Sequence, residues 1–361
     1  MAKKLRVAVL GAGVAGKGHI TAYLREGSAQ VVGLWSRKRA TAESAASELE
    51  VHDATVFDHW QDMIEQSECD IVSVATPPTL RLEPLALALE HDCHVLLEVP
   101  FAIGIDEPHT MAEIGSTTKT VTAVTLKLRY QPGTQFARRE IHDGRIGRIL
   151  SVSADWQYRL IERAWVETRP WSASLDLGDG GEASSYQFDT VRFVTGQEFE
   201  SIVTRFGRYH ITQDGSFPVD AGYQAHTAEL TGGAFASVRQ GVTAGIPLYN
   251  RFEFLGESGS MSVRPDQVQI RGEGDAETTT ANLRDDALQE YLAGGKHYTW
   301  DKVVGDFLLA LRSGDVAHRT VPDLPTLADG LEAQKVVYAA RLSDRDNRWV
   351  RIEEMDALIG V

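Results

Sequence analysis

The sequence predicts an α/β protein with two domains, and three patterns along its 361 residues support this fold class. Short β-branched runs alternate with helical patterns over the first 125 residues, which is typical of a parallel sheet covered on both faces. A glycine-rich turn follows the first run. From Ile149 onward, alternating strands and Gly-rich turns indicate a large, open, mostly antiparallel sheet. We therefore expect a doubly wound parallel domain over residues 1–125 and an α/β domain over residues 126–361.

The first domain is expected to contain five short strands, because runs rich in Val, Ile and Leu are typical of strands buried on both faces. These runs are Leu5–Leu10, Val31–Trp35, Ile71–Ala75, His94–Leu97 and Thr120–Thr125. Ala and Leu recur near the helical period in Arg39–Leu49 and Leu82–Glu90. A further helix is predicted after Pro132, ending at the Asp143-Gly144 stop signal.

The second domain is expected to alternate apolar and polar residues along six strands. These strands are Leu150–Tyr158, Ser201–Tyr209, Gln224–Leu230, Ala234–Gln240, Phe252–Leu255 and Ser260–Arg264. Helices are expected over Glu182–Thr195, Trp300–Arg312 and Thr326–Ala340. The acidic, Thr-rich segment Gly272–Ala287 is predicted to be a solvated surface loop.

Composition and charge exclude several classes of partner. A chain with 43% hydrophobic residues and this length can bury two cores, since single cores stop growing near roughly 250–300 residues. The sequence lacks the run of roughly 18 apolar residues that a membrane span needs, and its first residues do not form a signal segment. A formal net charge of −15 disfavours nucleic acid and anionic membranes through repulsion. We therefore expect a cytoplasmic protein.

The cysteines and histidines do not predict a metal site. Cys69 and Cys93 are the only cysteines, too few for a disulfide framework or a thiolate site, and we expect inert thiols. Histidines such as His91, His94 and His226 show no ligand spacing with acidic residues or cysteines.

A glycine motif follows the first predicted strand and opens a helix, which is the context in which it predicts dinucleotide binding. Gly11 permits a tight turn, Gly13 lets the backbone approach a pyrophosphate, and Gly16 allows close packing of helix on strand. Val14 and Ala15 would begin the helix, whose first N–H groups favour an anion. The alternative is a glycine-rich turn that holds no ligand.

The end of the second predicted strand favours NADP(H) over NAD(H). NAD-preferring proteins usually place an acidic residue about 20 residues after the glycine motif, to hold the ribose hydroxyls. This chain has Ser36, Arg37, Lys38 and Arg39 there. Cations at a helix start oppose its macrodipole unless an anion lies among them, and a 2′-phosphate would be such an anion. A solvated basic turn, with NAD(H) as cofactor, is the alternative.

Several motifs, in this order and spacing, resemble the Gfo/Idh/MocA family of oxidoreductases over nearly the whole chain. They are Gly11–Gly16 with His19, Val74–Pro78, His94–Pro100, Arg129–Pro132, Gly144–Ile149 and Gly256–Ser260. The resemblance implies a Rossmann domain, a substrate lying between the second sheet and the nicotinamide, and a homodimer or homotetramer formed through that sheet. It also implies that Thr76, Pro77 and Glu98 line the cofactor site.

The main departure from the family pattern is Val99. The family normally reads Glu-Lys-Pro where this chain has Glu98-Val99-Pro100, and that lysine contacts the reacting hydroxyl. Val99 would line the substrate site without this function. A second departure is Arg81, where the family often has histidine.

A third departure lies in the predicted helix over Glu182–Thr195. The family pattern is Asp, three residues, His, two residues, Asp, and this chain has Glu182, Tyr186 and Asp189, which share one helix face. Tyr186 could exchange a proton if neighbouring cations lowered its pKa, and Lys127 or Arg129 could be such a cation. The alternatives are that Tyr186 packs in the core, that Lys127 faces solvent, and that Asp189 only caps or forms a salt bridge.

Aromatic and basic residues are dense between Trp156 and Trp171, with Trp165 between them. Such rings stack on sugars or aromatic ligands, and arginines bind carboxylates, so an anionic or aromatic substrate is favoured over a neutral sugar. Oligomer packing is the alternative.

Three functions follow from these patterns. The first is an NAD(P)-dependent oxidoreductase with a modified proton-transfer set, acting on a sugar-like or cyclic hydroxyl or carbonyl compound. The second is a cofactor-dependent elimination or glycoside-cleaving enzyme without net redox. The third is a dinucleotide-binding regulator that catalyses no reaction.

Overall fold

The computed structural model describes residues 3–159, 180–209, 219–244, 248–284, 288 and 298–358. The chain divides into two compact units. One comprises Met1–Lys127 and Asp286–Leu331, and the other comprises Leu128–Asp285 and Glu332–Val361. This division differs from the expected domains 1–125 and 126–361, because a late segment of the chain packs with the first unit.

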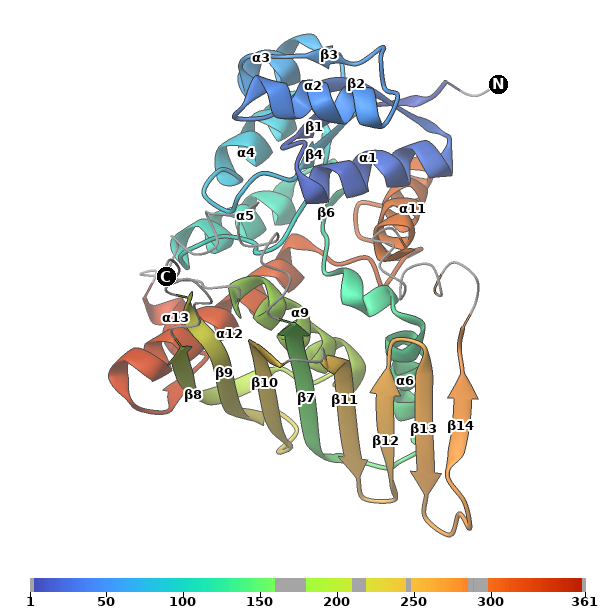
Figure 1. The fold of residues 1–361 in the computed structure, drawn as a ribbon, viewed down its shortest axis with the longest axis vertical. Coiled ribbons are helices and arrows are strands. Elements are labelled where there is room, and N and C mark those ends of the chain that lie inside the picture. Colours follow the sequence, from blue (N-terminus) through green and yellow to red (C-terminus); the bar gives the residue numbers. More distant parts are fainter. Residues whose placement is uncertain are drawn as a thin grey trace. The chain divides into compact units, whose positions relative to one another are not determined.

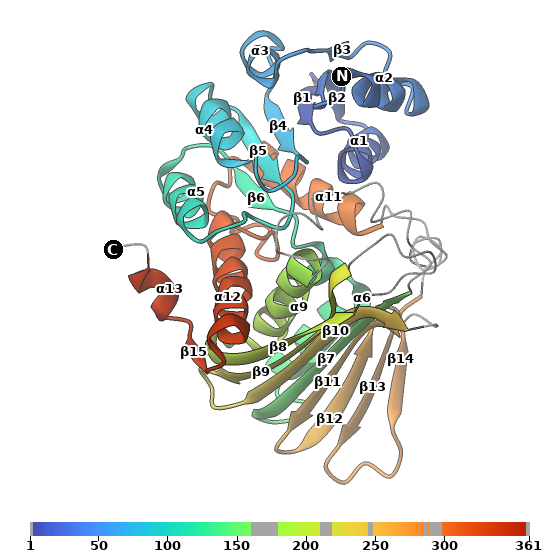
Figure 2. The same ribbon diagram turned by 60° about the vertical axis from the view of Figure 1, so that its left-hand side comes forward.

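The first unit is built on a six-stranded parallel sheet with the order β3-β2-β1-β4-β5-β6 (Figures 1 and 2). The strands are β1 (Leu5–Leu10), β2 (Ala29–Trp35), β3 (Thr55–Val56), β4 (Ile71–Val74), β5 (His94–Leu97) and β6 (Thr122–Val124). Val7 to Leu10 are fully buried, as expected for a strand covered on both faces. The doubly wound Rossmann fold predicted from the sequence is confirmed.

Five helices connect these strands and cover both faces of the sheet (Figure 2). They are α1 (Val14–Glu26), α2 (Arg39–Glu48), α3 (Trp60–Gln66), α4 (Leu82–Glu90) and α5 (Asp106–Thr117). Right-handed crossovers place helices on opposite faces when the strand order reverses, and it reverses here between β1 and β4. The sequence analysis did not predict β3, α3 or α5.

The late segment joins the first unit through α11 (Tyr298–Ser313), which lies beside α1 in Figures 1 and 2. Two ion pairs connect these helices, Arg25 with Asp301 at 3.0 Å and Arg312 with Glu26 at 2.9 Å. Phe307 of α11 is completely buried, and burial of such a side chain stabilises a fold by roughly 1.5–3 kcal/mol.

The second unit contains a nine-stranded sheet with the order β14-β13-β12-β11-β7-β10-β9-β8-β15. Its strands are β7 (Ile149–Arg159), β8 (Phe199–Tyr209), β9 (Val219–Leu230), β10 (Phe235–Ala244), β11 (Leu248–Gly256), β12 (Gly259–Arg264), β13 (Gln267–Gly272), β14 (Thr279–Asn282) and β15 (Val350–Arg351). All neighbouring strands are antiparallel except β7 and β10. The predicted large, mostly antiparallel sheet is confirmed.

Helices pack on one face of this sheet. The helical elements are the 3₁₀ turn η1 (Lys127–Tyr130), α6 (Pro132–His142), α9 (Gly180–Thr195), α12 (Leu327–Asp346) and α13 (Glu354–Ala357). α9 contacts β7 and β10, and α6 contacts β12 and β13. α6 starts at Pro132 and, as predicted, stops before Gly144, whose φ of 82° requires glycine.

The prediction of a surface loop over Gly272–Ala287 is wrong in part, because Thr279–Asn282 forms β14 at the edge of the sheet. Threonine favours strands through its branched Cβ, and an edge strand needs only one partner. Its polar residues therefore remain exposed while β13 supplies the hydrogen bonds.

Candidate active site

The glycine turn lies at the carboxyl end of β1, next to the end of β4. Gly11 has a φ of 88°, and a Cβ there would come within 2.6 Å of the Ala75 carbonyl oxygen. A Cβ on Gly16 would lie 1.8 Å from the Gly11 carbonyl oxygen. Both glycines are therefore required by the fold itself, for the turn and for helix-on-strand packing as predicted.

Gly13 is different, because no atom other than those of its chain neighbours lies within 4 Å of the position of its Cβ. The first turn of α1 contains no acidic residue, and no side chain caps the helix at Gly13. Its first N–H groups therefore suit a bound anion. The turn fits a dinucleotide pyrophosphate, which Gly13, Val14, Ala15 and Gly16 would hold.

The turn after β2 has both buried and exposed polar residues. The buried Ser36 hydroxyl accepts a hydrogen bond from the Ala12 N–H at 2.7 Å, so Ser36 supports the glycine turn. Arg39 binds Asp58 at 2.6 Å and Glu43 at 2.8 Å. Arg37 and Lys38 are exposed and form no ion pair within the described part of the chain, so they are the cations available to a phosphate.

Arg81 joins the carboxyl ends of β4 and β5. Its buried guanidinium donates to the Thr76 carbonyl oxygen at 2.9 and 3.3 Å and to the Val99 carbonyl oxygen at 3.4 Å. The Thr76 hydroxyl donates to the Leu80 carbonyl oxygen and closes the same turn. Arg81 thus positions the two strand ends that carry the predicted site residues Thr76, Pro77, Glu98 and Val99.

Glu98 is the centre of a buried polar cluster at the end of β5. One carboxylate oxygen accepts from the Trp300 indole N–H at 2.7 Å and lies 3.0 Å from the His19 Nε2. The other accepts from the Val99 N–H at 3.1 Å. The His19 Nδ1 lies 2.8 Å from the Ser73 hydroxyl. Three elements of the first unit, α1, β4 and α11, thereby fix this carboxylate beside residue 99.

Lys127 adds a cation to this cluster. Its Nζ lies 4.5 Å from the centre of the Trp300 ring, a cation–π arrangement. Burial alone would raise the pKa of Glu98, but the Lys127 ammonium and the hydrogen bonds from His19 and Trp300 hold it well below its usual range. Glu98 is therefore an anion, and it attracts the ammonium toward the end of β5.

Trp300 is the site residue that sequence reasoning missed. A Cβ on Gly18 would lie 2.4 Å from the Trp300 ring, so glycine at that position is the only local sign of the contact. The helix that carries Trp300 follows Glu98 by about 200 residues, and periodicity alone cannot reveal its packing partner.

In the second unit, Tyr186 is almost fully buried on α9, and its ring lies 6.2 Å from the Trp156 ring. Gln240 pairs in register with Trp156 on one side and with Gln224 on the other. The Gln240 amide donates to the Gln224 amide oxygen at 2.7 Å, and Ser184 of α9 donates to the same oxygen at 3.3 Å. Buried polar side chains of α9, β9 and β10 are thus bonded to one another in the layer that contains Tyr186.

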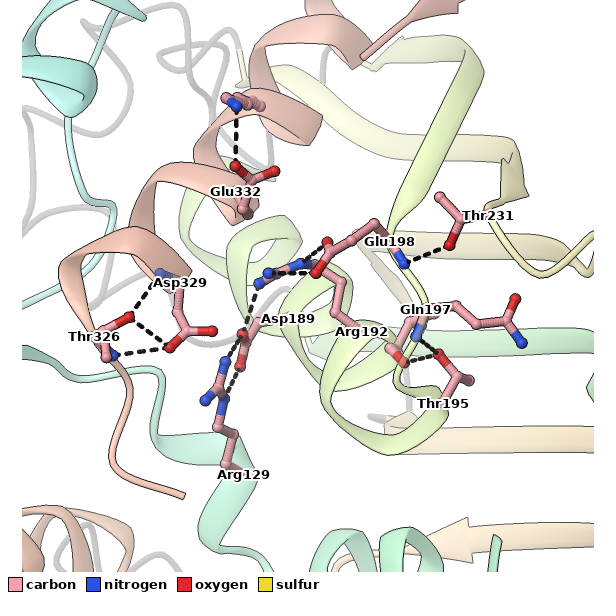
Figure 3. A network of polar contacts seen from close by, with 12 residues as sticks. Arg129, Asp189, Arg192, Thr195, Gln197, Glu198, Thr231, Thr326, Asp329 and Glu332 are labelled. Atoms are coloured by element: carbon pink, nitrogen blue, oxygen red, sulfur yellow. Dashed lines mark hydrogen bonds and ion pairs between the residues drawn. The ribbon is translucent and has the colours of Figure 1, made fainter. Parts of the chain in front are cut away.

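Arg129 and Asp189 bind each other. The guanidinium donates to both carboxylate oxygens, at 2.8 and 2.6 Å, and both residues are buried (Figure 3). Arg192 lies 3.4 Å from Asp189 and also binds Glu198. This geometry favours the salt-bridge alternative for Asp189.

The remaining predicted site residues are not all described. Glu182 lies within α9, and Trp165 and Trp171 lie outside the described residues. The described residues contain no group of three potential ligands placed to hold a metal ion. None of their helices combines the length and apolar character that a membrane crossing requires.

The fold and the glycine turn define a dinucleotide-binding protein with a second, sheet-based domain. Residues 5–126 match the model of the oxidoreductase family with an NAD-binding Rossmann fold, and residues 134–262 match the GFO/IDH/MocA C-terminal domain. The chain belongs to the GFO/IDH/MocA family of oxidoreductases.

Several relatives are sugar or polyol dehydrogenases. Levoglucosan dehydrogenase of Pseudarthrobacter phenanthrenivorans is 25% identical over 406 aligned positions, which cover 98% of this chain and 100% of that enzyme. D-glucoside 3-dehydrogenase of Escherichia coli is 28% identical over 214 residues, covering 56% of this chain and 59% of that enzyme. The match to an uncharacterized oxidoreductase of Synechocystis covers 53% of this chain and 52% of that protein, at 25% identity.

Solved structures share the fold over nearly the whole chain. Levoglucosan dehydrogenase in complex with NADH and levoglucosan has a TM-score of 0.81 at 22% identity, covering 97% of this chain and 99% of that chain. An oxidoreductase from Agrobacterium radiobacter has a TM-score of 0.82 at 16% identity, covering 98% of this chain and 100% of that chain.

Proposed function

We propose that this protein is a nicotinamide-dependent dehydrogenase or reductase of a small sugar-like or cyclic hydroxyl or carbonyl compound. The observation that carries the proposal is the Glu98 cluster, because it holds a buried anion and a lysine beside the strand end next to the glycine turn. The substrate class is supported by relatives that are glucoside, levoglucosan and inositol dehydrogenases.

The first unit would hold the dinucleotide through the N–H groups at the start of α1, with Thr76, Pro77 and Glu98 along the carboxyl ends of β4 and β5. We propose NADP(H) as the preferred form and NAD(H) as an alternative. Arg37 and Lys38 support this preference, since their charges have no described carboxylate partner, whereas Arg39 has two.

When bound, the nicotinamide supplies or accepts hydride, so the protein must manage the accompanying proton. We propose that the Lys127 ammonium supplies the positive charge for which the family resemblance predicts a lysine at position 99. Lys127 would donate a hydrogen bond to the reacting oxygen and stabilise negative charge there as its proton leaves or arrives. The Glu98 carboxylate and the Trp300 ring would keep the ammonium in position.

Residues of the second unit would bind the substrate and complete the proton transfer. We propose that Trp156 stacks on the substrate, that Tyr186 exchanges a proton with it, and that Glu182 assists on the same helix. Arg129 and Asp189 would act by fixing α9, since their bidentate pair uses both carboxylate oxygens. Val99, Trp165 and Trp171 remain predicted substrate contacts. The contacts of Arg129 do not support an anionic substrate, because its guanidinium binds the Asp189 carboxylate.

We also propose a homodimer or homotetramer formed through the face of the second sheet opposite α6 and α9. Phe235 and Leu255 flank Ser151 in register on that face, with exposures of 51% and 50%. Paired apolar side chains of this kind are typical of an interface. The cytoplasmic location remains a prediction.

The test is an assay of nicotinamide absorbance with NADP(H) and NAD(H) against levoglucosan, simple glucosides and myo-inositol. A net change with at least one compound is expected. Product release without net absorbance change would replace the proposal with an elimination or glycoside-cleaving activity. Dinucleotide binding without turnover of any compound would favour a regulator.

A further inference from the structure

Two thiols lie side by side in the first unit, away from the proposed site. The Sγ atoms of Cys69 and Cys93 are 3.7 Å apart, and the Cys93 Sγ lies 3.1 Å from the Cys69 carbonyl oxygen. The cysteines precede β4 and β5, whose first paired residues are Ile71 and His94. They therefore lie at the amino ends of strands whose carboxyl ends carry Thr76 and Glu98.

The geometry permits a covalent bond between these sulfurs. Neighbouring strands lie about 4.8 Å apart, and disulfides span Cα separations of roughly 4.4–6.8 Å. The backbone is fixed at this point, because the Asp70 carbonyl oxygen accepts from the His94 N–H at 2.9 Å. The sulfurs need to approach by roughly 1.7 Å to reach the bond length of about 2.0 Å, which side-chain rotation can supply.

The two thiols differ in access and in acidity. Cys69 is partly exposed, whereas Cys93 is 2% exposed. A hydrogen bond from the Cys93 thiol lowers the pKa of Cys69 to about 7. The shared hydrogen bond and burial raise the pKa of Cys93. Cys69 is therefore the thiol that attacks an external reagent, and Cys93 is placed to react with the product.

We propose that Cys69 and Cys93 form a reversible intramolecular disulfide by exchange with a low-molecular-weight disulfide. The Cys69 thiolate attacks one sulfur of the reagent, forms a mixed disulfide and releases one thiolate. The Cys93 thiol then loses its proton, its sulfur attacks the Cys69 sulfur, and the second reagent thiol leaves. Two protein thiols are oxidised and one reagent disulfide is reduced to two thiols.

The charge around the pair favours a cationic reagent. Asp70 and Asp92 act on the Cys93 thiol through their negative charge. Glu68 adjoins Cys69 and is itself 4.0 Å from the Arg6 guanidinium. Cystamine, a small cationic disulfide, is therefore the appropriate probe.

The experiment treats the full-length folded protein with cystamine, blocks remaining thiols by alkylation and measures the intact mass. The wild type is expected to lose two hydrogens, to carry no adduct, and to yield tryptic segments 40–81 and 82–119 joined together. Dithiothreitol should restore both thiols. Cys93→Ser should retain a cysteamine adduct on Cys69, and Cys69→Ser should remain unmodified under the same conditions.

Three outcomes would overturn the proposal. The wild type could keep both thiols free, or it could accumulate stable adducts without an internal bond. Alternatively, Cys69→Ser could react as fast as the wild type, which would mean that the buried thiol is the accessible one. The double variant Cys69→Ser/Cys93→Ser provides the unreactive control.

Discussion

The two units of this protein each bury a carboxylate that the sequence marks as a site residue, and the two carboxylates differ in their partners. Glu98 accepts hydrogen bonds from the Trp300 indole and the Val99 N–H, and the positive charge of Lys127 lowers the pKa of Glu98 further. Asp189 is bound through both oxygens by the Arg129 guanidinium. Glu98 is the centre of the polar contacts at the end of β5, whereas the salt bridge of Asp189 with Arg129 connects α9 to η1.

Burial and sequence position therefore do not by themselves identify a reacting group. A bidentate arginine uses the accepting capacity of a carboxylate and fixes its geometry. Neutral donors leave the negative charge to attract a cation such as Lys127. The first arrangement stabilises the fold, and the second positions a group for chemistry.

The largest effect is expected for Lys127→Met. If Lys127 stabilises charge on the reacting oxygen, kcat should fall by about 10²–10⁴-fold, while calorimetry should report unchanged dinucleotide affinity. Lys119→Met, which removes an exposed ammonium nearby in the sequence, should retain activity. Adding Val99→Lys to Lys127→Met should restore part of the lost kcat. Equal activity of Lys127→Met and the wild type would contradict the role of Lys127.

Asp189→Asn should lower the free energy of unfolding by about 3 kcal/mol, because it leaves the Arg129 guanidinium buried without a full counter-charge. Asp155→Asn removes the partner of Arg239 in a more exposed pair, and its cost should stay below about 1 kcal/mol. Urea unfolding measures both values. If Asp189→Asn abolished turnover without loss of stability, Asp189 would belong with Glu98 as a site residue.

His226, a buried histidine of the second unit, makes the stability of the protein depend on pH. His226 bonds to the Thr204 hydroxyl at 2.9 Å, and burial lowers its pKa to about 3. Below about pH 6.5 the His226 ring is protonated in the unfolded chain but stays neutral in the folded chain. The stability that His226 contributes is therefore fully present above about pH 6.5 and is lost as the pH falls toward 3. Between about pH 7 and pH 5, the wild type should lose about 2 kcal/mol more than His226→Gln. The exposed His52→Gln control should follow the wild type, and parallel curves for His226→Gln and the wild type would refute the expectation.

The smallest effect concerns cofactor choice. Arg37→Ala combined with Lys38→Ala should weaken NADP(H) about tenfold, because two exposed cations each contribute roughly 1 kcal/mol or less to binding of a phosphate. The affinity for NAD(H) should change little. Equal losses for both dinucleotides in calorimetry would remove the proposed preference.

The sequence predicted the first unit well where the determinants are local. Gly11 and Gly16 are required by atoms within one turn or on the adjacent strand, so a motif of six residues carries that information. The predicted ends of β1, β5 and α4 also agree with the observed ends, because buried runs and amphipathic periods define them. The strand β14 was missed because polar threonines on an edge resemble a loop.

Contacts between distant segments could not be predicted. Trp300 reaches Glu98 only because α11 packs on α1, and no local pattern encodes that packing. Arg129 and Asp189 were marked separately as site residues, and only the fold brings the two charges together. The proximity of Cys69 and Cys93 likewise depends on the pairing of β4 with β5, which the expectation of inert thiols did not consider.

Calorimetric titration of Gly13→Val with NADP(H) tests whether a dinucleotide binds at the glycine turn. Gly13 has a φ of −77°, which a side chain tolerates, and no atom other than those of its chain neighbours lies near its Cβ position, so the variant should fold with only a small N-cap cost in stability, of about 1 kcal/mol. Its side chain would occupy the space assigned to the pyrophosphate, and the affinity should fall at least tenfold, by roughly 1.4 kcal/mol or more. Binding as tight as in the wild type would contradict a dinucleotide at this turn.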